Sequence, residues 1–255
     1  MSPDKFRFSS ARDVAQALPP PDRLALFLDV DGTLIGPTHD DREAGVPAEQ
    51  LALLGRVRAL TGGALAILTG RTIDMVDDMF GPLELPVGGL QGADRRLPDG
   101  RRTALSLTDR QRTIIHGLEQ EIATALPGVT VERKLAGLTI VFDEDAEVAA
   151  RAAAIAVRHV GTAFAVIRGR IAIDIVPPGA DKGTALAIFA GETPFSGRQP
   201  VHIGDDVPDR PAFTAARRLG GFGVAVHNPV SEADYALSSH DDVWTLLDAY
   251  ASLHG

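Results

Sequence analysis

Two aspartates follow directly after an apolar stretch near the start of the chain. Leu24–Leu28 is an unbroken apolar run, and Asp29 and Asp31 come next. Such a run predicts a strand that is buried on both faces of a parallel sheet. Because side chains alternate along a strand, we expect both carboxylates to project to the same side at its carboxyl end, where open α/β sheets bind ligands. Two carboxylates this close repel each other unless a bound cation or a shared proton offsets their charge.

Polar residues also follow other apolar segments. They are Thr69 after the run 64–68, Lys182 at the start of an expected helix, and Asp205, Asp206 and Asp209 after the run 200–203. Each signal alone is weak, because acidic residues often cap helices and a D-x-D pair also occurs in metal-dependent glycosyltransferases. Their joint occurrence, always at a strand end or a helix start, predicts one site assembled from several segments.

The order of apolar segments predicts a parallel sheet that positions these residues. We expect strands near 24–28, 64–68 and 86–90, with helices over 47–60 and 72–80 between them. This βαβαβ order implies right-handed crossovers and parallel pairing. The same pattern returns after Pro177, with strands near 200–203, 223–226 and 235–237 and helices over 181–190, 209–219 and 243–253.

Between these two halves the pattern changes to strands that pair locally. Strand pairs are expected within 94–107, 129–142 and 163–176, with helices over 109–126 and 145–160. Local pairing of this kind is typical of an α+β module. We therefore predict an α/β fold with a doubly wound parallel-sheet core, formed by 1–100 and 175–255, and an inserted α+β cap at 101–174.

Composition limits the class of protein. The 255 residues are 45% hydrophobic and 23% charged, which is ordinary for a globular protein, and cysteine is absent, which excludes disulfides and thiolate chemistry. No apolar stretch is long enough for a membrane span and the N-terminus has no signal-peptide pattern, so we expect a cytoplasmic monomer. The net charge of −9, without a dense Lys/Arg cluster, argues against nucleic acid as a partner. An anionic substrate would need a local positive charge from a metal or a lysine.

The polar signals, taken in order, resemble the motifs of the haloacid-dehalogenase (HAD) superfamily of phosphohydrolases. The four segments are 29–34 (DVDGTL), 69–71 (TGR), Lys182 and 204–209 (GDDVPD). Beyond these motifs, the chain resembles the trehalose-6-phosphate phosphatase family at 92–96, 132–134, 178–183 and 194–198. That resemblance implies a HAD-like core with a cap of the C2B type between the second and third motifs.

The resemblance also implies a role for each residue at the sheet edge. Asp29 would be the nucleophile that forms an aspartyl-phosphate, and Asp31 the general acid and base. The implied cofactor is Mg²⁺, held by Asp29, the backbone carbonyl of Asp31, Asp205, Asp206 and Asp209. The phosphoryl oxygens would be contacted by Thr69, Lys182 and the backbone N–H groups of Gly32 and Thr33.

A small sugar phosphate is the implied substrate, most simply trehalose 6-phosphate. The residues that would bind it are Arg71, Gln91, Gly92, Asp94, Glu132, Lys134 and Asp174, in addition to Gly32 and Thr33. The chain departs from the family pattern at 91–94, where Gln-Gly-Ala-Asp replaces His-Gly-Ala-Glu, and at 141–143, where Val-Phe-Asp replaces His-Tyr-Arg. Because buried polar groups recognise sugar hydroxyls, such changes affect specificity more than rate.

Four alternatives remain open at this level. The substrate can be a different sugar phosphate, or the chain can be a non-catalytic sugar-phosphate sensor that kept the fold. A sugar mutase of the same superfamily is disfavoured by the large cap between the second and third motifs, and a glycosyltransferase would not require Thr69 or Lys182.

His202, in an expected buried strand, is interpreted as a core histidine.

Overall fold

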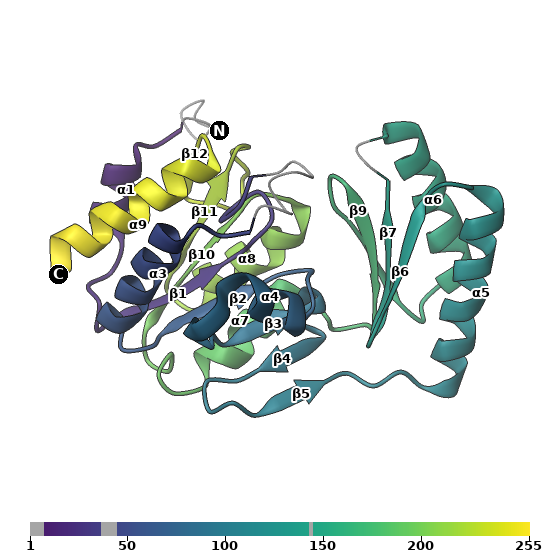
Figure 1. Ribbon diagram of the computed structural model, residues 1–255, viewed down its shortest axis with the longest axis horizontal. Helices are drawn as coiled ribbons and strands as arrows, with labels where there is room; N and C mark the ends of the chain where they lie inside the picture. Colours follow the sequence, from purple (N-terminus) through teal and green to yellow (C-terminus); the bar gives the residue numbers. More distant parts are fainter. Residues whose placement is uncertain (1–7, 37–44, 143–144) are drawn as a thin grey trace.

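The computed structural model describes residues 8–36, 45–142 and 145–255, which form a core domain and a cap domain (Figure 1). The chain leaves the core for the cap through 105–108 and returns through 177–181. Asp143, one of the three residues at which the chain departs from the family pattern in the cap, lies outside the described residues.

The core domain contains an eight-stranded sheet. Its strands are β1 (Leu24–Leu28), β2 (Leu65–Leu68), β3 (Val87–Gly89), β4 (Asp94–Arg96), β5 (Arg102–Ala104), β10 (Gln199–Gly204), β11 (Phe222–Val226) and β12 (Tyr235–Leu237). The strand order is β12-β11-β10-β1-β2-β3-β4-β5, in which the β3–β4 and β4–β5 pairs are antiparallel and the other pairs are parallel. The connections proceed in opposite directions on the two sides of β1, so the carboxyl end of β1 is the topological switch point where such sheets bind ligands.

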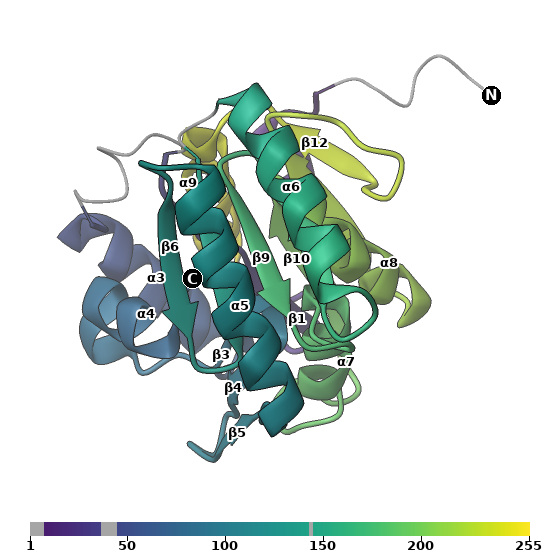
Figure 2. The same ribbon diagram turned by 90° about the vertical axis from the view of Figure 1, so that its right-hand side faces the viewer.

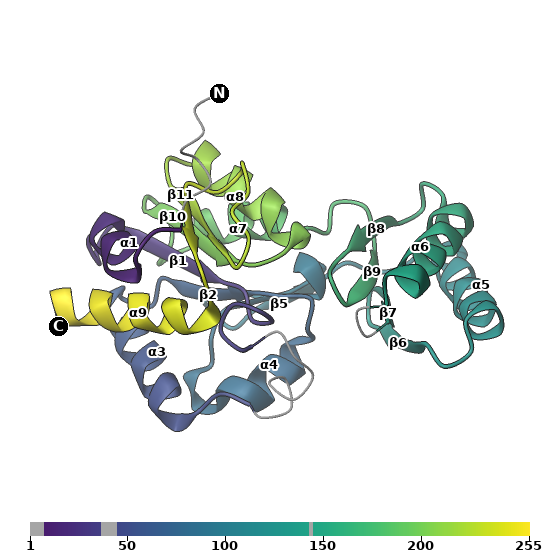
Figure 3. The ribbon, with the colours of Figure 1, turned by 90° about the horizontal axis from the view of Figure 1, so that it is seen from above.

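Helices cover both faces of this sheet (Figure 3). One face carries α1 (Ala11–Ala17), α3 (Ala48–Leu60), α4 (Ile73–Phe80) and α9 (His240–His254), and the other carries α7 (Lys182–Ala190) and α8 (Arg210–Arg218). The alternation in β1 explains this double cover: Leu24, Leu26 and Leu28 pack into the first layer, whereas Ala25 and Phe27 pack into the second. The predicted doubly wound core is therefore confirmed.

The cap is a four-stranded antiparallel sheet backed by two helices. Its elements are α5 (Asp109–Ala125), β6 (Thr130–Lys134), β7 (Gly137–Val141), α6 (Ala146–Val160), β8 (Ala165–Arg168) and β9 (Ala172–Val176), with strand order β6-β7-β9-β8. Both helices lie on the face of the sheet that is turned away from the core (Figures 1 and 2). Leu118, Ile140 and Ile175 belong to a hydrophobic cluster separate from that of the core domain. The open face of the cap sheet is left to face the core.

The boundaries of the cap differ from the predicted 101–174. The hairpin β4–β5 extends the core sheet through pairing of β4 with β3, so the cap elements begin with α5 at Asp109. At the other end β9 continues to Val176. Alternation within a hairpin predicts the strands but not the sheet edge that they join, which is why the sequence placed the first boundary too early.

Local signals in the sequence determine where the helices of the cap begin. The Thr108 side chain accepts a hydrogen bond from the backbone N–H of Gln111, and the Gln111 side chain accepts one from the Thr108 N–H, which forms a capping box at α5. Asp145 caps α6 by accepting from the N–H groups of Glu147 and Val148. Within the described ranges, no helix combines the length and the apolarity needed to cross a bilayer.

Candidate active site

Asp29 lies at the carboxyl end of β1 and is 4% exposed. Its backbone N–H donates to the carbonyl of Ile203 in β10, which continues the parallel pairing by one residue. The turn that follows requires Gly32, whose φ is +81° and whose Cα lies so near Asp205 that an added Cβ would overlap the Asp205 carboxylate. The turn thereby brings the acidic segments 29–31 and 205–209 together.

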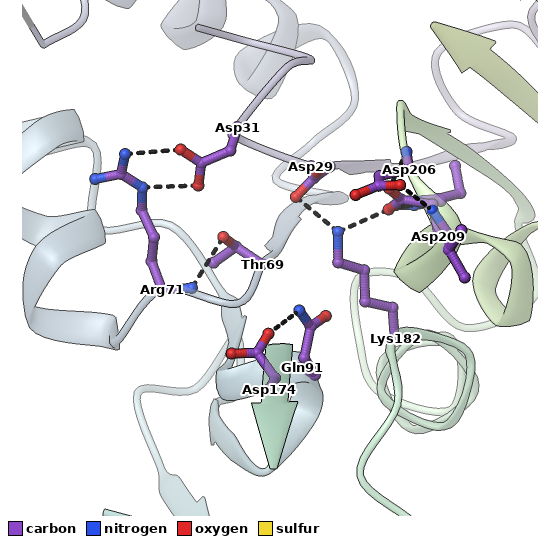
Figure 4. A network of polar contacts seen from close by, with 11 residues as sticks. Asp29, Asp31, Thr69, Arg71, Gln91, Asp174, Lys182, Asp206 and Asp209 are labelled. Atoms are coloured by element: carbon purple, nitrogen blue, oxygen red, sulfur yellow. Dashed lines mark hydrogen bonds and ion pairs between the residues drawn. The ribbon is translucent and has the colours of Figure 1, made fainter. Parts of the chain in front are cut away.

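Lys182 connects the nucleophile candidate to the acidic loop after β10. Its Nζ lies 2.7 Å from Asp29 Oδ1 and 2.7 Å from Asp209 Oδ1. Figure 4 draws both contacts as dashed lines. All three side chains are buried, and the two carboxylates raise the pKa of Lys182 despite the cost of burying its charge. Lys182 and His202 in turn hold the pKa of Asp209 at about 2, against the effect of burial. The ammonium group and Asp209 therefore both stay charged.

Three carboxylates converge beside Lys182. One oxygen from each of Asp29, Asp205 and Asp209 lies within 4.8 Å of the others. Burial and the charge of Asp209 raise the pKa of Asp29 well above its usual value, and burial with the nearby carboxylates raises that of Asp205 to about 7. Burial and the neighbouring carboxylates together therefore outweigh the opposing effect of Lys182 on both groups. Such an all-oxygen set suits a hard divalent cation, so the residues present fit a metal.

Asp31 faces away from this cluster. Arg71 binds it through two parallel hydrogen bonds, with Nε 2.9 Å from Oδ2 and Nη2 2.8 Å from Oδ1 (Figure 4). The prediction that alternation would align Asp29 with Asp31 is wrong in its reason, because β1 ends at Leu28 and the turn orients both residues. Asp29 contacts Lys182, whereas Asp31 contacts Arg71.

Asp206 is not a member of the converging set, although the sequence placed it among the metal-site residues. Its Oδ1 accepts from the N–H of Val207 at 2.7 Å, and its Oδ2 accepts from the N–H of Arg170 in the cap at 2.7 Å. Both of its carboxylate oxygens are therefore engaged by backbone amides.

A cavity of about 560 Å³ separates the cap sheet from this end of the core. The residues expected at the site that line it are Asp29, Asp31, Arg71, Gln91, Glu132, Lys134, Asp174, Lys182, Asp205, Asp206 and Asp209. A cavity of this size matches a ligand of one or two sugar rings in the ordinary range of small-molecule sites. The cap contributes a wall with apolar residues, including Val141, Ile171 and Ala172.

Gln91 joins the core to the cap inside the cavity. Its Nε2 donates to Asp174 Oδ2 at 2.7 Å, and Thr139 Oγ1 donates to the other oxygen of Asp174 at 2.7 Å. Burial raises the pKa of Asp174, an effect that these two hydrogen bonds oppose. Gln91 Oε1 is buried and has no hydrogen-bond partner among the described residues. The residue has φ 55°, a conformation rare outside glycine, as expected where a functional constraint overrides backbone preference.

Five expected residues do not line the cavity: Gly32, Thr33, Thr69, Gly92 and Asp94. Thr69 is buried and its Oγ1 accepts from the N–H of Arg71 at 3.2 Å, so it supports the loop that carries Arg71. Gly92 allows close packing on α7, since an added Cβ would lie 2.8 Å from Cβ of Ala185.

Asp94, predicted to bind substrate, has both carboxylate oxygens engaged by Arg102. Nε donates to Oδ1 at 3.0 Å and Nη2 to Oδ2 at 2.6 Å. Asp94 is 1% exposed and thus joins β4 to β5 instead of facing a ligand. Thr33 Oγ1 is buried and finds no hydrogen-bond partner in the part of the chain that the structure describes.

Two residues act in the site without having been singled out for it. His202, interpreted as a core histidine, is buried, and its Nε2 lies 2.7 Å from Asp209 Oδ1. Thr139 lies directly opposite Asp174 in the pairing of β7 with β9, and a sequence without this register gives no signal for the contact. The seven-residue separation of His202 from Asp209 could have suggested the first contact, once strand and turn were placed.

Comparison with known proteins identifies the family. The family model described as trehalose-phosphatase matches residues 27–242, which include every residue of this site. The chain belongs to the trehalose-phosphatase family. The members of this family in the comparison are named as phosphatases, which are phosphoric monoester hydrolases.

Two relatives of this trehalose-phosphatase family member are similar along most of their length. A probable trehalose-phosphate phosphatase of Sinorhizobium fredii is 36% identical, over 91% of this chain and 89% of its own. The trehalose-6-phosphate phosphatase of Escherichia coli is 30% identical, over 89% of this chain and 86% of its own.

Solved structures share the fold. The C-terminal domain of trehalose-6-phosphate phosphatase from C. albicans superposes with a TM-score of 0.79 at 16% identity, covering 95% of both chains. A HAD-superfamily phosphatase from Bacteroides thetaiotaomicron gives a TM-score of 0.61 at 20% identity, covering 89% of this chain and 94% of its own. The predicted HAD-like fold is therefore confirmed.

Proposed function

We propose that this chain is a Mg²⁺-dependent phosphatase that hydrolyses trehalose 6-phosphate to trehalose and phosphate. The observation that carries the proposal is the buried Asp29 carboxylate, held by Lys182 at the floor of the cavity and accompanied by Asp205 and Asp209. A sensor that only binds a sugar phosphate would gain nothing from a buried nucleophile beside the Lys182 ammonium group. The names of the relatives supply the substrate.

The reaction requires a nucleophile, a proton donor and positive charge. In the first step an oxygen of Asp29 bonds to phosphorus, the bond from phosphorus to the sugar oxygen breaks, and Asp31 gives that oxygen a proton. In the second step Asp31 takes a proton from water, the water oxygen bonds to phosphorus, and the bond to Asp29 breaks. In this structure Arg71 binds both oxygens of Asp31, at 2.8 and 2.9 Å, so the proposed acid and base role requires this carboxylate to leave Arg71 and turn toward the phosphoryl group.

Positive charge comes from Lys182 and from the proposed metal. Lys182 already contacts Asp29 and lines the cavity, so its ammonium group lies next to any phosphoryl group on Asp29. Mg²⁺ bound by Asp29, Asp205 and Asp209 would offset the charge of the substrate and of the carboxylates. Asp31 can add its backbone carbonyl to that set.

Polar side chains around the middle of the cavity support recognition of a sugar. Glu132 and Lys134 project from β6, with Lys134 Nζ 2.6 Å from Glu132 Oε2. Gln91 lines the same cavity from the core. A ring of such groups discriminates strongly among hydroxylated ligands, because a missing hydroxyl leaves one of them unpaired.

A second candidate is a different sugar phosphate. Val141, at the first position where the chain departs from the family pattern in the cap, lines the cavity beside Ile171 and Ala172. This apolar wall makes no hydrogen bond to a hydroxyl, so it favours a substrate that presents carbon-bound hydrogens there. Phe142, the next position of that departure, is buried in the hydrophobic cluster of the cap and does not line the cavity.

Phosphate release from a panel of sugar phosphates tests both candidates. The panel contains trehalose 6-phosphate, glucose 6-phosphate, other mono- and disaccharide phosphates and an aryl phosphate, each with Mg²⁺ and with a chelator. We expect release that depends on Mg²⁺ and is fastest with trehalose 6-phosphate. Preference for another sugar favours the second candidate. Absence of release from every member, including the aryl phosphate, would leave binding without catalysis as the function.

A further inference from the structure

A hydrogen bond from the cap reaches the acidic loop of the core. The backbone N–H of Arg170, in the turn between β8 and β9, donates to Asp206 Oδ2 at 2.7 Å. The approach is close, since a Cβ added at Gly169 would lie 3.1 Å from the same oxygen. This turn therefore touches the residue that follows the metal-site candidate Asp205.

Asp206 also organises the loop in which it lies. Its Oδ1 accepts from the N–H of Val207 at 2.7 Å, and its own N–H donates to Asp209 Oδ2 at 3.2 Å. Asp209 accepts from Lys182 Nζ through its other oxygen, and Lys182 contacts Asp29. Hydrogen bonds thus run without a break from the cap turn through Asp206 to the nucleophile candidate.

The neighbouring carboxylates are arranged differently. Asp205 and Asp209 converge with Asp29, whereas each oxygen of Asp206 accepts from a backbone amide. A hydrogen bond from an amide to a charged carboxylate is stronger than one to a neutral acceptor. The cap can make this bond only when its turn is seated against the core.

We propose that Asp206 is a positioning residue that holds the cap closed and couples its closure to the arrangement of the catalytic loop, instead of ligating the metal. The proposal rests on the proposed function and adds to it how the site is completed. Because the bond to Arg170 exists only with the cap seated, it favours the closed state, and in that state it fixes the loop that carries Asp205 and Asp209. A substrate that touches the cap benefits from this bond, whereas one confined to the floor of the cavity gains little.

The test uses Asp206→Asn, Arg170→Pro and the double variant. Asparagine keeps an oxygen for the Val207 amide but presents an NH₂ group, which does not accept from Arg170, while proline removes the Arg170 donor. Arg170→Ala is the matched control, because it removes the side chain and keeps the amide. Each protein is assayed with the best sugar phosphate and with an aryl phosphate, titrated with Mg²⁺ by calorimetry, and compared by amide hydrogen exchange over 168–172.

Loss of a charge-assisted hydrogen bond predicts a fall of about 10- to 100-fold in kcat/KM for the sugar phosphate. We expect Asp206→Asn and Arg170→Pro to show this fall, largely through KM, and the double variant to be no worse than either within about twofold. Turnover of the aryl phosphate and the affinity for Mg²⁺ should each change less than about threefold, and exchange over 168–172 should become faster. Arg170→Ala removes a cation that lines the cavity and lowers the pKa of Asp205, but it keeps the amide, so exchange over 168–172 should stay as slow as in the wild type.

Three results would overturn the proposal. A loss of Mg²⁺ affinity of about tenfold or more in Asp206→Asn would make Asp206 a metal residue. Additive effects in the double variant would separate Asp206 from Arg170. Exchange over 168–172 that is as fast in Arg170→Ala as in Asp206→Asn would move the contact to the Arg170 side chain. If Arg170→Pro does not fold, Asp206→Asn and Arg170→Ala still decide through exchange and Mg²⁺ affinity. If the wild type hydrolyses no phosphate ester, the proposed function fails, while exchange and Mg²⁺ titration continue to test the bond to the cap.

Discussion

At the scale of single residues, the site depends on which carboxylate contacts which cation. Asp29 and Asp209 share Lys182, whereas Asp31 binds Arg71. The raised pKa of Asp29 follows from burial and from the charge of Asp209, and Lys182 opposes it.

Replacement of the nucleophile should separate chemistry from folding. We expect Asp29→Asn to lower kcat by at least about 10³-fold, because no other oxygen occupies that position. The amide still accepts from Lys182, which keeps Asp209 as its charged partner, and one buried charge is removed. The free energy of unfolding at pH 7 should therefore not fall. Phosphate release and chemical denaturation measure the two effects, and hydrolysis within tenfold of the wild type would rule out Asp29 as the nucleophile.

At the scale of elements, β6 shows how one strand serves two surfaces. Thr130, Glu132 and Lys134 line the cavity, while Val131 packs against the cap cluster. Arg133 points to the other face and forms an ion pair with Glu119 of α5. A period of two therefore divides the strand between ligand recognition and cap structure.

This alternation predicts that substitution of a cavity-lining residue of β6 affects activity, whereas substitution of its neighbour on the other face does not. Glu132→Gln should lower kcat/KM for the true sugar phosphate by about tenfold, the value of one charge-assisted hydrogen bond, and leave hydrolysis of an aryl phosphate nearly unchanged. Arg133→Gln, the matched control on the other face, should change neither, since an exposed ion pair contributes little. Steady-state kinetics on both substrates measure this difference. Equal losses on both substrates for Glu132→Gln would show that Glu132 does not contact the sugar.

At the scale of the whole molecule, two domains with separate hydrophobic clusters enclose one charged cavity. The core supplies the proposed nucleophile and the converging carboxylates, and the cap supplies polar groups that line the cavity. Without a cation the convergence of Asp29, Asp205 and Asp209 costs folding free energy, because the raised pKa values record an unfavourable charge in the folded state. Metal binding and overall stability should therefore be coupled.

The coupling of metal binding to stability predicts how the stability changes with pH when a chelator removes the metal. The folded-state pKa of Asp205 is about 7, above its ordinary value of 3.8. The contribution of Asp205 to the free energy of unfolding is therefore fully present below about pH 4 and is lost as the pH rises through 7. The raised pKa of Asp29 likewise lowers the stability as the pH rises. The Tm should fall by roughly 5 °C between pH 6.5 and 8.5, and Mg²⁺ should raise it more at pH 8.5 than at pH 6.5.

Asp209 titrates below this window, and His202 opposes the trend only at its lower edge. The pKa of Asp209 is about 2, so its stabilising contribution is lost only in strong acid. Burial lowers the pKa of His202, which makes the fold less stable as the pH falls below its ordinary value of 6.5. Asp205→Asn is the matched variant and should flatten the pH dependence in differential scanning calorimetry. A wild-type Tm that is constant or rises from pH 6.5 to 8.5 in chelator would contradict the prediction.

The sequence by itself determined the parallel core, the interruption by a cap and most residues of the site. Apolar runs that end in Asp29, Thr69 and Asp205 are local signals, and the rule that ligands bind at the carboxyl edge of such a sheet turns them into one site. Strand and helix positions follow from periodicity and caps, which depend only on near neighbours in the chain.

Only the tertiary structure decided which polar groups meet. Asp94 contacts Arg102 instead of the cavity, Asp206 contacts the cap instead of the converging carboxylates, and His202 supports Asp209. Each of these outcomes depends on strand register, on the sheet edge that a hairpin joins, or on the position of the cap over the core. Those quantities result from packing between segments far apart in the chain, and the pattern of residue types within one segment carries no information about them.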